Sequence, residues 1–407
     1  PRYNAIDVAK FRCAYNKGLL ILASATPSVE SYASALSGKY GLCTLTSRYG
    51  QAHLPDVITV DMRTEEKVEG CKSISKTLYD CLNENLEKGM QSILLINRRG
   101  YHTFAACNSC GEVICCPNCS ISMTYHAANN RLMCHYCGHS VPFSSVCPEC
   151  GEDAVRYSGF GTQKIEDELS NLFPQAKILR MDTDSTSGKN SHEKLLESFS
   201  KGEYDIMIGT QMVAKGLNFP NVTLVGVVSV DQQLYNDDFR SLERTFSLLT
   251  QVVGRSGRGE HPGKAVIQTL TPENEIIRIA AKQDYDEFFE TEIRIRKALI
   301  YPPYCDICVI GLVCEDETVI KSASRRVLEL IKERTGGSYK NEKIIAMGPM
   351  PARVSKVNNK FRYRLIIKCR NSSSFRAMIS EILIEMAKDS AFSSVTTYAD
   401  INPDSAI

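Results

Sequence analysis

The hydrophobic positions of this chain follow two alternating patterns. Short apolar runs of strand length occur at 18–25, 92–96, 177–181, 205–209, 222–230 and 264–270. Apolar side chains recur at helical spacing in residues 73–89, 163–172, 191–200 and 239–253. Because apolar strands alternate with amphipathic helices, the sequence predicts an α/β fold with a parallel sheet covered by helices on both faces.

The pattern changes toward the end of the chain. Residues 272–300 are predicted to form one long charged helix, which Tyr301-Pro302-Pro303 would end. Residues 301–407 predict a small α+β domain, with strands at 307–314 and 361–369 and helices at 317–335 and 374–388. Residues 40–70 show neither pattern and are interpreted as a connector.

Composition narrows the class of protein. The chain has 48 Lys and Arg against 47 Asp and Glu, a net charge of +1, which excludes a globally basic chromatin-type protein but not a local basic patch. Hydrophobic content of 43% and charged content of 23% indicate a soluble folded protein. No apolar run reaches the ~18 residues of a membrane helix, and no secretory signal opens the chain. The first residue is Pro1, which predicts that further residues precede it.

Cysteine is enriched in one segment. Of 17 cysteines, eight form four C-x2-C pairs, namely Cys107/Cys110, Cys116/Cys119, Cys134/Cys137 and Cys147/Cys150. Two such pairs complete a closed tetrahedral thiolate site with Zn–S distances of about 2.3 Å, so four pairs predict two structural zinc ions. A disulfide cluster and iron are the less favoured alternatives. Spacing alone leaves open which pairs share an ion.

Residues near these pairs have expected roles of their own. Glycine directly follows the second cysteine of three pairs, at Gly111, Gly138 and Gly151, where it allows a tight turn. Eight thiolates already complete two sites. We therefore expect none of the nearby histidines (His126, His135, His139) to bind metal, and Cys115 to be a spare thiol.

A second group of motifs follows the predicted strands. The segment Gln251-Val252-Val253-Gly254-Arg255-Ser256-Gly257-Arg258 places two arginines on one side of a helix end, where they could neutralise a triphosphate across a cleft. Taken alone, the pair could equally be a surface feature. However, polar or glycine-rich loops also follow strands at 24–26 (SAT), 97–100 (NRRG) and 209–216 (GTQMVAKG), and such loops bind ligands in α/β sheets.

The order of these motifs resembles a known family. SAT, RRG, GTQM-x-AKG-x-x-FP, DFRSLER and QVVGRSGRG follow one another as in superfamily 2 helicases. The eight-cysteine insert resembles one family among them, the primosomal replication-restart helicases (PriA). Similar segments (YPPY at 301–304, GPMPA at 348–352, DINPDSAI at 400–407) extend the resemblance over essentially the whole chain.

The resemblance implies a domain organisation. Residues 1–70 would be the end of helicase lobe 1 and a connector, and 71–106 with 157–300 would form the RecA-like lobe 2. Residues 107–156 would be the zinc-binding insert, and 301–407 a DNA-binding α+β domain.

It also implies site residues. Gln251, Arg255 and Arg258 would contact ATP, with the arginines as fingers; Lys215, Gly216 and Asn218 would line the nucleotide cleft. Ser24 and Thr26 would couple hydrolysis to lobe movement, and Arg98, Arg99, Thr210 and Gln211 would lie beside DNA. The family's nested pairing implies one zinc on Cys107, Cys110, Cys147 and Cys150, and the other on Cys116, Cys119, Cys134 and Cys137.

The implied function is an ATP- and Mg²⁺-dependent 3′→5′ DNA helicase that recognises stalled replication forks and restarts replication by primosome assembly. Its partners would be forked and single-stranded DNA, a single-strand-binding protein and helicase-loader proteins. We expect a cytoplasmic, nucleoid-associated monomer with no membrane contact. The chain lacks G-x4-G-K-[ST] and a DExH box, which the family carries upstream, so these residues alone should not hydrolyse ATP. The alternative is a non-catalytic zinc-dependent DNA-binding adaptor.

One basic strand completes the sequence predictions. Eight basic and no acidic residues lie between Arg353 and Arg376. Strand alternation places Lys360, Arg362 and Arg364 on one face, which we predict to bind the DNA backbone. Phe361 and Tyr363 take the other face and are expected to pack in the core.

Overall fold

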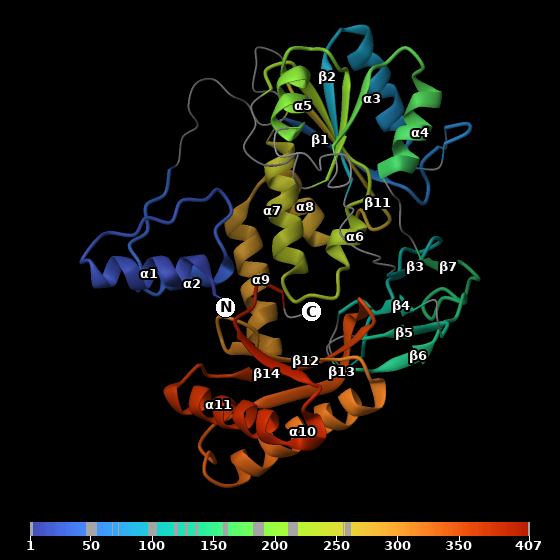
Figure 1. Ribbon diagram of the computed structural model, residues 1–407. Coiled ribbons are helices and arrows are strands. Elements are labelled where there is room, and N and C mark those ends of the chain that lie inside the picture. Colours follow the sequence, from blue (N-terminus) through green and yellow to red (C-terminus); the bar gives the residue numbers. More distant parts are fainter. Residues whose placement is uncertain are drawn as a thin grey trace.

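A computed structural model of the 407 residues shows a parallel sheet at one end and an antiparallel sheet at the other (Figure 1). It describes residues 3–405 except 46–54, 67, 72, 97–103, 118–120, 127–128, 135–136, 158–161, 182–190, 211–218, 255 and 257–261. None of the helices in these ranges has the length and apolar character needed to cross a membrane.

The parallel sheet confirms the predicted α/β lobe. Its six strands, counted over the described residues, lie in the order β1-β11-β10-β2-β9-β8, and every pair is parallel. The bounds are β1 Asp56–Asp61, β2 Gln91–Leu95, β8 Ile178–Met181, β9 Ile206–Gly209, β10 Val222–Val227 and β11 Lys264–Thr269. Strands β2, β9 and β10 are buried at every residue, because helices cover both faces, and this explains their unbroken apolar runs.

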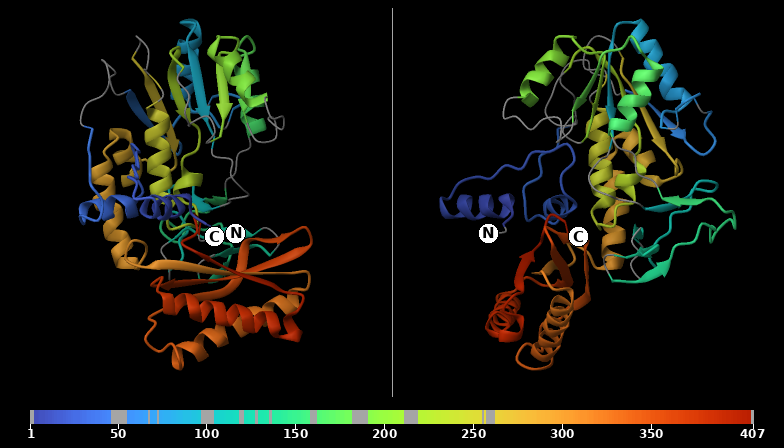
Figure 2. Two further views of the ribbon diagram at one scale, coloured as in Figure 1. Left: turned by 60° about the vertical axis from the view of Figure 1, so that its left-hand side comes forward. Right: turned by 45° about the vertical axis from the view of Figure 1, so that its right-hand side comes forward.

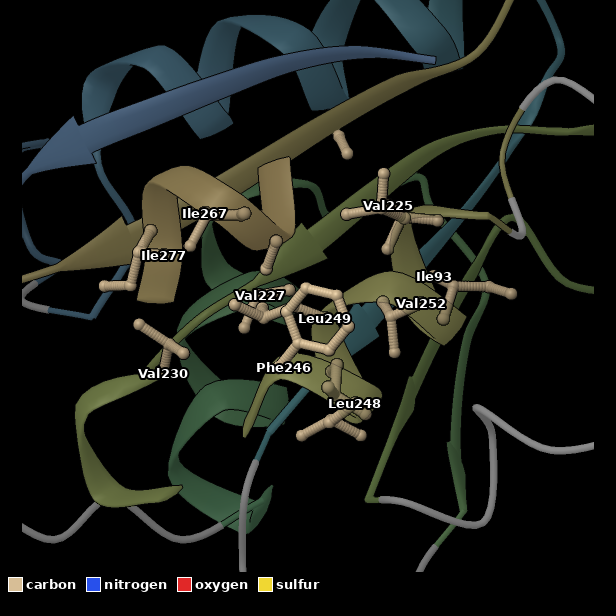
Figure 3. Close-up of a cluster of buried hydrophobic side chains, with 14 of the residues drawn as sticks. Ile93, Val225, Val227, Val230, Phe246, Leu248, Leu249, Val252, Ile267 and Ile277 are labelled. Atoms are coloured by element: carbon tan, nitrogen blue, oxygen red, sulfur yellow. The ribbon is translucent and has the colours of Figure 1, made fainter. Parts of the chain in front are cut away.

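Helices pack on the two faces of this sheet in separate groups. On one face, α3 (Lys76–Glu87) and α4 (Thr162–Leu172) bury Leu78 and Leu169. On the other lie α5 (Ser191–Ser200), α7 (Ser241–Val253) and α8 (Glu275–Lys282). Figure 3 shows Phe246 and Leu249 of α7 beside the sheet residues Val225 and Val227. A short helix, α6 (Asp231–Leu234), follows β10.

Three sequence predictions in this part were wrong. Residues 18–25 form no strand, and Leu19 is 84% exposed: no described strand pairs with them, and an unpaired strand leaves its backbone groups without partners. The segment is flanked instead by α1 (Ala5–Tyr15) and α2 (Val29–Leu36). The supposed connector contains β1, an edge strand of the parallel sheet.

The third error concerns the predicted helix 272–300. It is two helices, α8 and α9 (Tyr285–Leu299), because Gln283 adopts a left-handed conformation (φ 56°) that ends the first one. The Asp284 carboxylate then accepts a hydrogen bond from the Glu287 N–H at 2.9 Å and so caps the second. Helix α9 leads from the parallel sheet toward the C-terminal domain (Figure 2).

The C-terminal domain is a four-stranded antiparallel sheet with the order β13-β14-β12-β15. Its elements are β12 Asp306–Cys314, α10 Glu317–Gly336, β13 Ile345–Val357, β14 Lys360–Cys369, α11 Ser373–Lys388, the 3-10 turn η1 Ser390–Phe392 and β15 Thr396–Ile401. Helices α10 and α11 cover one face of the sheet. The predicted helices and two strands are confirmed, whereas β13 and β15 were missed.

The cysteine-rich insert folds into two small antiparallel sheets. One pairs β3 (Ala105–Cys107) with β7 (Val155–Tyr157), and the other joins β4 (Thr124–His126), β5 (Arg131–Met133) and β6 (Ser140–Pro142). The sheet of β4, β5 and β6 lies beside β13 of the C-terminal sheet, and the β3–β7 pair lies closer to the parallel-sheet lobe (Figure 1). Buried residues of the insert share one hydrophobic cluster with Phe239, Tyr301 and Ile366, so the insert packs against both larger parts of the protein.

Candidate metal centre and helicase motifs

Three of the four cysteine pairs form the same backbone turn. In the pair at 147, the Cys147 N–H donates to the Glu152 carbonyl (2.8 Å), and the Gly151 N–H donates to the Cys147 carbonyl (3.0 Å). The pairs that begin at Cys107 and Cys134 repeat both bonds. The glycine of each turn has a φ between 76° and 84°, a conformation that disfavours a side chain. The predicted role of these glycines is confirmed.

The turns bring the sulfur atoms into two clusters. Cys107, Cys110, Cys147 and Cys150 form one, and Cys116, Cys134 and Cys137 form the other, while Cys119 lies outside the described residues. Sulfur separations are 3.7 Å for Cys107–Cys150, 3.6 Å for Cys110–Cys147 and 3.6 Å for Cys116–Cys137. A tetrahedron with Zn–S bonds of about 2.3 Å has edges of about 3.8 Å, whereas a disulfide is about 2.05 Å long. The clusters therefore fit structural zinc, in the nested arrangement that the resemblance implies.

The thiols of the first cluster differ: the pKa of Cys107 is lowered, whereas burial and the neighbouring thiols raise the pKa of Cys110 and of Cys150. Burial opposes charge on Cys107, but the N–H groups of Cys110 and Ser109 lower the pKa of its thiol to about 7. Zinc binds the thiolate form of cysteine, and the lowered pKa of Cys107 favours that form. Neither cluster includes a histidine among the described residues.

An arginine fastens the first zinc turn to the parallel sheet. Arg63, just after β1, donates from Nη1 to the Cys110 carbonyl at 2.7 Å. The same guanidinium forms two hydrogen bonds to Asp61, at 2.7 and 2.8 Å, which fix its plane. A Cβ on Gly111 would lie 2.5 Å from Arg63 Nη1, so the glycine also makes room for this contact. No sequence motif pointed to Arg63.

A buried acid joins the insert to the C-terminal domain. Asp237 lies 3.0 Å from Arg353 and accepts a 3.4 Å hydrogen bond from Thr124 of the insert. Burial raises the pKa of Asp237, and the nearby charges of Arg353 and Arg364 oppose that rise. The loop before α7 thus contacts the insert and the C-terminal domain through one side chain.

Two of the predicted motor residues, Thr26 and Gln251, both contact the side chain of Ser247. Thr26 Oγ1 lies 2.8 Å from Ser247 Oγ, and Gln251 Nε2 donates to the same oxygen at 3.0 Å. Ser24 Oγ accepts from the Thr26 N–H at 3.1 Å. Thr210 directly follows β9 and is half-buried. The other predicted nucleotide and DNA residues of the parallel-sheet lobe lie outside the described residues: Arg98, Arg99, Gln211, Lys215, Gly216, Asn218, Arg255 and Arg258.

Sequence analysis missed an ionic network beside these residues. Arg296 of α9 is 1% exposed and contacts Glu292 (2.8 Å), Glu243 (2.7 Å) and Glu30 (3.2 Å). Its guanidinium also donates to the Pro302 carbonyl at 3.2 Å. The four-residue spacing of Glu292 and Arg296 was a signal, but such spacing usually marks an exposed pair. The network ties α2, α7, α9 and the start of the C-terminal domain together.

One residue of the predicted basic face, Arg364, is buried. Arg364 is only 4% exposed and lies near Asp237, so it does not present its charge to solvent as predicted. Alternation along β14 holds, but the face of Arg364 and Ile366 is covered where it meets the insert. Lys360 is exposed and Arg362 partly exposed. Phe361 and Tyr363 pack against the core of the domain, as expected.

Family models match three segments of the chain. Residues 116–142 match the PriA DNA helicase Cys-rich region domain, and 156–260 match the helicase conserved C-terminal domain. Residues 297–404 match the primosomal protein N C-terminal domain. The matches cover the central part of the insert, most of the parallel-sheet lobe after it and the C-terminal domain.

Two relatives that match nearly the whole chain carry the same name. The chain is 41% identical over 403 residues to replication restart protein PriA of Bacillus subtilis, covering 99% of the chain and 49% of that protein. It is 40% identical over 409 residues to replication restart protein PriA of Chlamydia trachomatis, covering 99% of the chain and 53% of that protein. The chain thus spans about half the length of the curated relatives it matches.

Proposed function

Because the chain belongs to the PriA family of replication restart proteins, we propose that its full-length gene product is an ATP-dependent 3′→5′ DNA helicase that restarts replication at stalled forks. The observation that carries the proposal is the insertion of two thiolate clusters into a helicase-type parallel sheet. Its partners would be forked and single-stranded DNA, a single-strand-binding protein and primosome or helicase-loader proteins. It would act as a nucleoid-associated monomer.

The motor residues have separate roles in this proposal. Bound ATP and Mg²⁺ supply the phosphoryl-transfer chemistry. Arg255 and Arg258 neutralise charge on the triphosphate, and Gln251 orients it. Lys215, Gly216 and Asn218 border the nucleotide. Arg98, Arg99, Thr210 and Gln211 would bind DNA, and Ser24 and Thr26 would couple hydrolysis to movement of the lobes.

The zinc ions have a structural role. Cys107, Cys110, Cys147 and Cys150 would hold one ion, and Cys116, Cys119, Cys134 and Cys137 the other. Three of the four turns are closed by backbone hydrogen bonds, and four thiolates around each ion would leave no position for a substrate. The 407 residues alone lack a P-loop and a DExH box, so by themselves they act as a zinc-dependent DNA-binding adaptor.

The direct test is unwinding by the purified full-length gene product. We expect ATP-dependent separation of forked DNA from a 3′ tail but not from a 5′ tail, with hydrolysis stimulated by single-stranded DNA. The 407-residue chain should bind the same fork without hydrolysing ATP. A full-length protein that binds DNA and hydrolyses no ATP would contradict the proposal and favour the adaptor.

Arg362→Glu should weaken binding of forked DNA. Lys360 and Arg362 remain accessible on β14, and each phosphate contact adds about 0.7–0.9 to the slope of log affinity against log salt. We expect the slope to fall by about one, measured by fluorescence anisotropy. Lys332→Glu is the matched control, because Lys332 is exposed on α10. An unchanged slope for Arg362→Glu would show that this face does not touch the backbone.

A further inference from the structure

One face of helix α7 carries a line of polar side chains. Glu243, Ser247 and Gln251 are four residues apart, and Arg240 precedes the helix in the same line. Residues three or four apart lie on one side of a helix, whereas the apolar side chains of α7 face the core. The polar line is therefore directed away from the parallel sheet.

This polar line pairs in order with the segment that contains the SAT motif. Arg240 contacts Glu30 at 2.6 Å, and the Glu243 carboxylate accepts from the Val29 N–H at 3.0 Å. One turn further along α7, Ser247 meets Thr26 at 2.8 Å. The two segments thus run alongside each other in opposite directions and are joined by these three polar contacts.

Ser247 is the residue of this polar line that contacts residues 26–30 and lies closest to Gln251 along the helix. A hydroxyl has one hydrogen to donate and two lone pairs to accept with. Gln251 Nε2 can only donate, so the Ser247 oxygen accepts from it. Either hydroxyl can donate in the bond between Ser247 and Thr26, and in both cases two consecutive hydrogen bonds connect Gln251 through Ser247 to Thr26.

We infer that Ser247 is a positioning residue that transmits the position of the Thr26 segment to Gln251. The inference deepens the proposed function and rests on it. When the segment of residues 24–30 moves against α7, the bond at Ser247 breaks and Gln251 loses its orientation. Hydrolysis and strand separation are then linked through this hydroxyl, and without it hydrolysis continues more slowly but drives less strand separation.

The test compares three variants of the full-length gene product. Ser247→Ala should reduce base pairs unwound per ATP roughly tenfold, which corresponds to the loss of one hydrogen bond, with a smaller loss of kcat for ATP because Gln251 is less well oriented. Ser247→Thr keeps the hydroxyl and should restore coupling. Thr250→Ala is the control on the same helix, because Thr250 Oγ1 has no hydrogen-bond partner among the described residues. All variants should keep the wild-type melting temperature.

A double-mutant cycle with Thr26→Val completes the test. If the three residues act as one chain, Thr26→Val combined with Ser247→Ala should unwind no worse than either single variant. Additive losses, equal losses of hydrolysis and unwinding, or no rescue by Ser247→Thr would overturn the inference. A wild-type protein without DNA-stimulated hydrolysis would overturn the proposed function as well, so the two failures are distinguishable.

Discussion

Cys116→Ser is expected to remove one of two bound zinc ions, whereas Cys115→Ser should remove none. The two cysteines are neighbours, but Cys116 is 1% exposed with its sulfur 3.6 Å from that of Cys137, and Cys115 is exposed and outside both clusters. Serine does not ionise near neutral pH, so it cannot replace a thiolate ligand. Zinc per protein chain, measured by mass spectrometry after gel filtration, should be close to one and two respectively.

The loss should also unfold part of the insert. Structural zinc contributes about 10–16 kcal/mol to the folding of small modules, and the insert's short strands have little core of their own. Limited proteolysis should therefore cut the Cys116→Ser variant within 107–156 and leave Cys115→Ser intact. Equal zinc content in both variants would contradict the assignment of Cys116, and metal-bound protein with iron absorption would contradict zinc.

Arg296→Met is expected to destabilise the folded protein by about 3–5 kcal/mol, because it leaves buried carboxylates without their cation. Glu292 is 1% exposed and Glu243 also contacts Arg296, so neither can recover full hydration. Methionine keeps much of the side-chain volume, which limits the effect of a cavity. Urea unfolding followed by circular dichroism measures the difference. Arg294→Met, two residues away on the exposed side of α9, should change stability by less than about 0.5 kcal/mol.

The destabilisation should depend on pH. Burial would raise the pKa of Glu243, but the charges of Arg296 and Arg240 hold it below its ordinary value. In the wild type this carboxylate therefore stabilises the fold above its ordinary pKa, and the contribution is lost as the pH falls. Without Arg296, burial raises the pKa instead, and the variant loses stability as the pH rises. The gap between wild type and variant should be larger at about pH 7.5 than at about pH 5. A gap that is the same at both values would exclude a buried ionic origin.

The ionic network around Arg296 lies next to the predicted motor residues. Arg296 and Glu243 fasten α9 and α7 to Glu30, which lies four residues beyond Thr26. The ionic part is centred on Arg296 and Glu292, which are fully buried, whereas Thr26, Ser247 and Gln251 are half-buried. When α7 and residues 24–30 move relative to each other, we therefore expect the hydrogen bond between Thr26 and Ser247 to break first, because breaking the buried ion pairs costs more free energy.

Sequence patterns predicted most helices and strands where local and tertiary preferences agree. The central strands β2, β9 and β10 are apolar throughout because both faces are buried, and this pattern is visible without a structure. Residues 18–25 have the same pattern and form no strand, because strand formation needs a partner that no local pattern specifies. The same limit explains why edge strands β1, β13 and β15 were missed: their residues alternate weakly, and pairing with a neighbour creates them.

The sequence by itself determined the chemistry of this protein: the cysteine pairs, the glycines that close their turns and the order of the motor motifs are local features, and local spacing is enough to specify them. Only the tertiary structure decided which groups meet. It buried Arg364 against Asp237, set Arg63 on the first zinc turn and joined Thr26 to Gln251 through Ser247. Contacts between residues far apart in the chain depend on how sheets and helices pack, and no short-range pattern encodes that geometry.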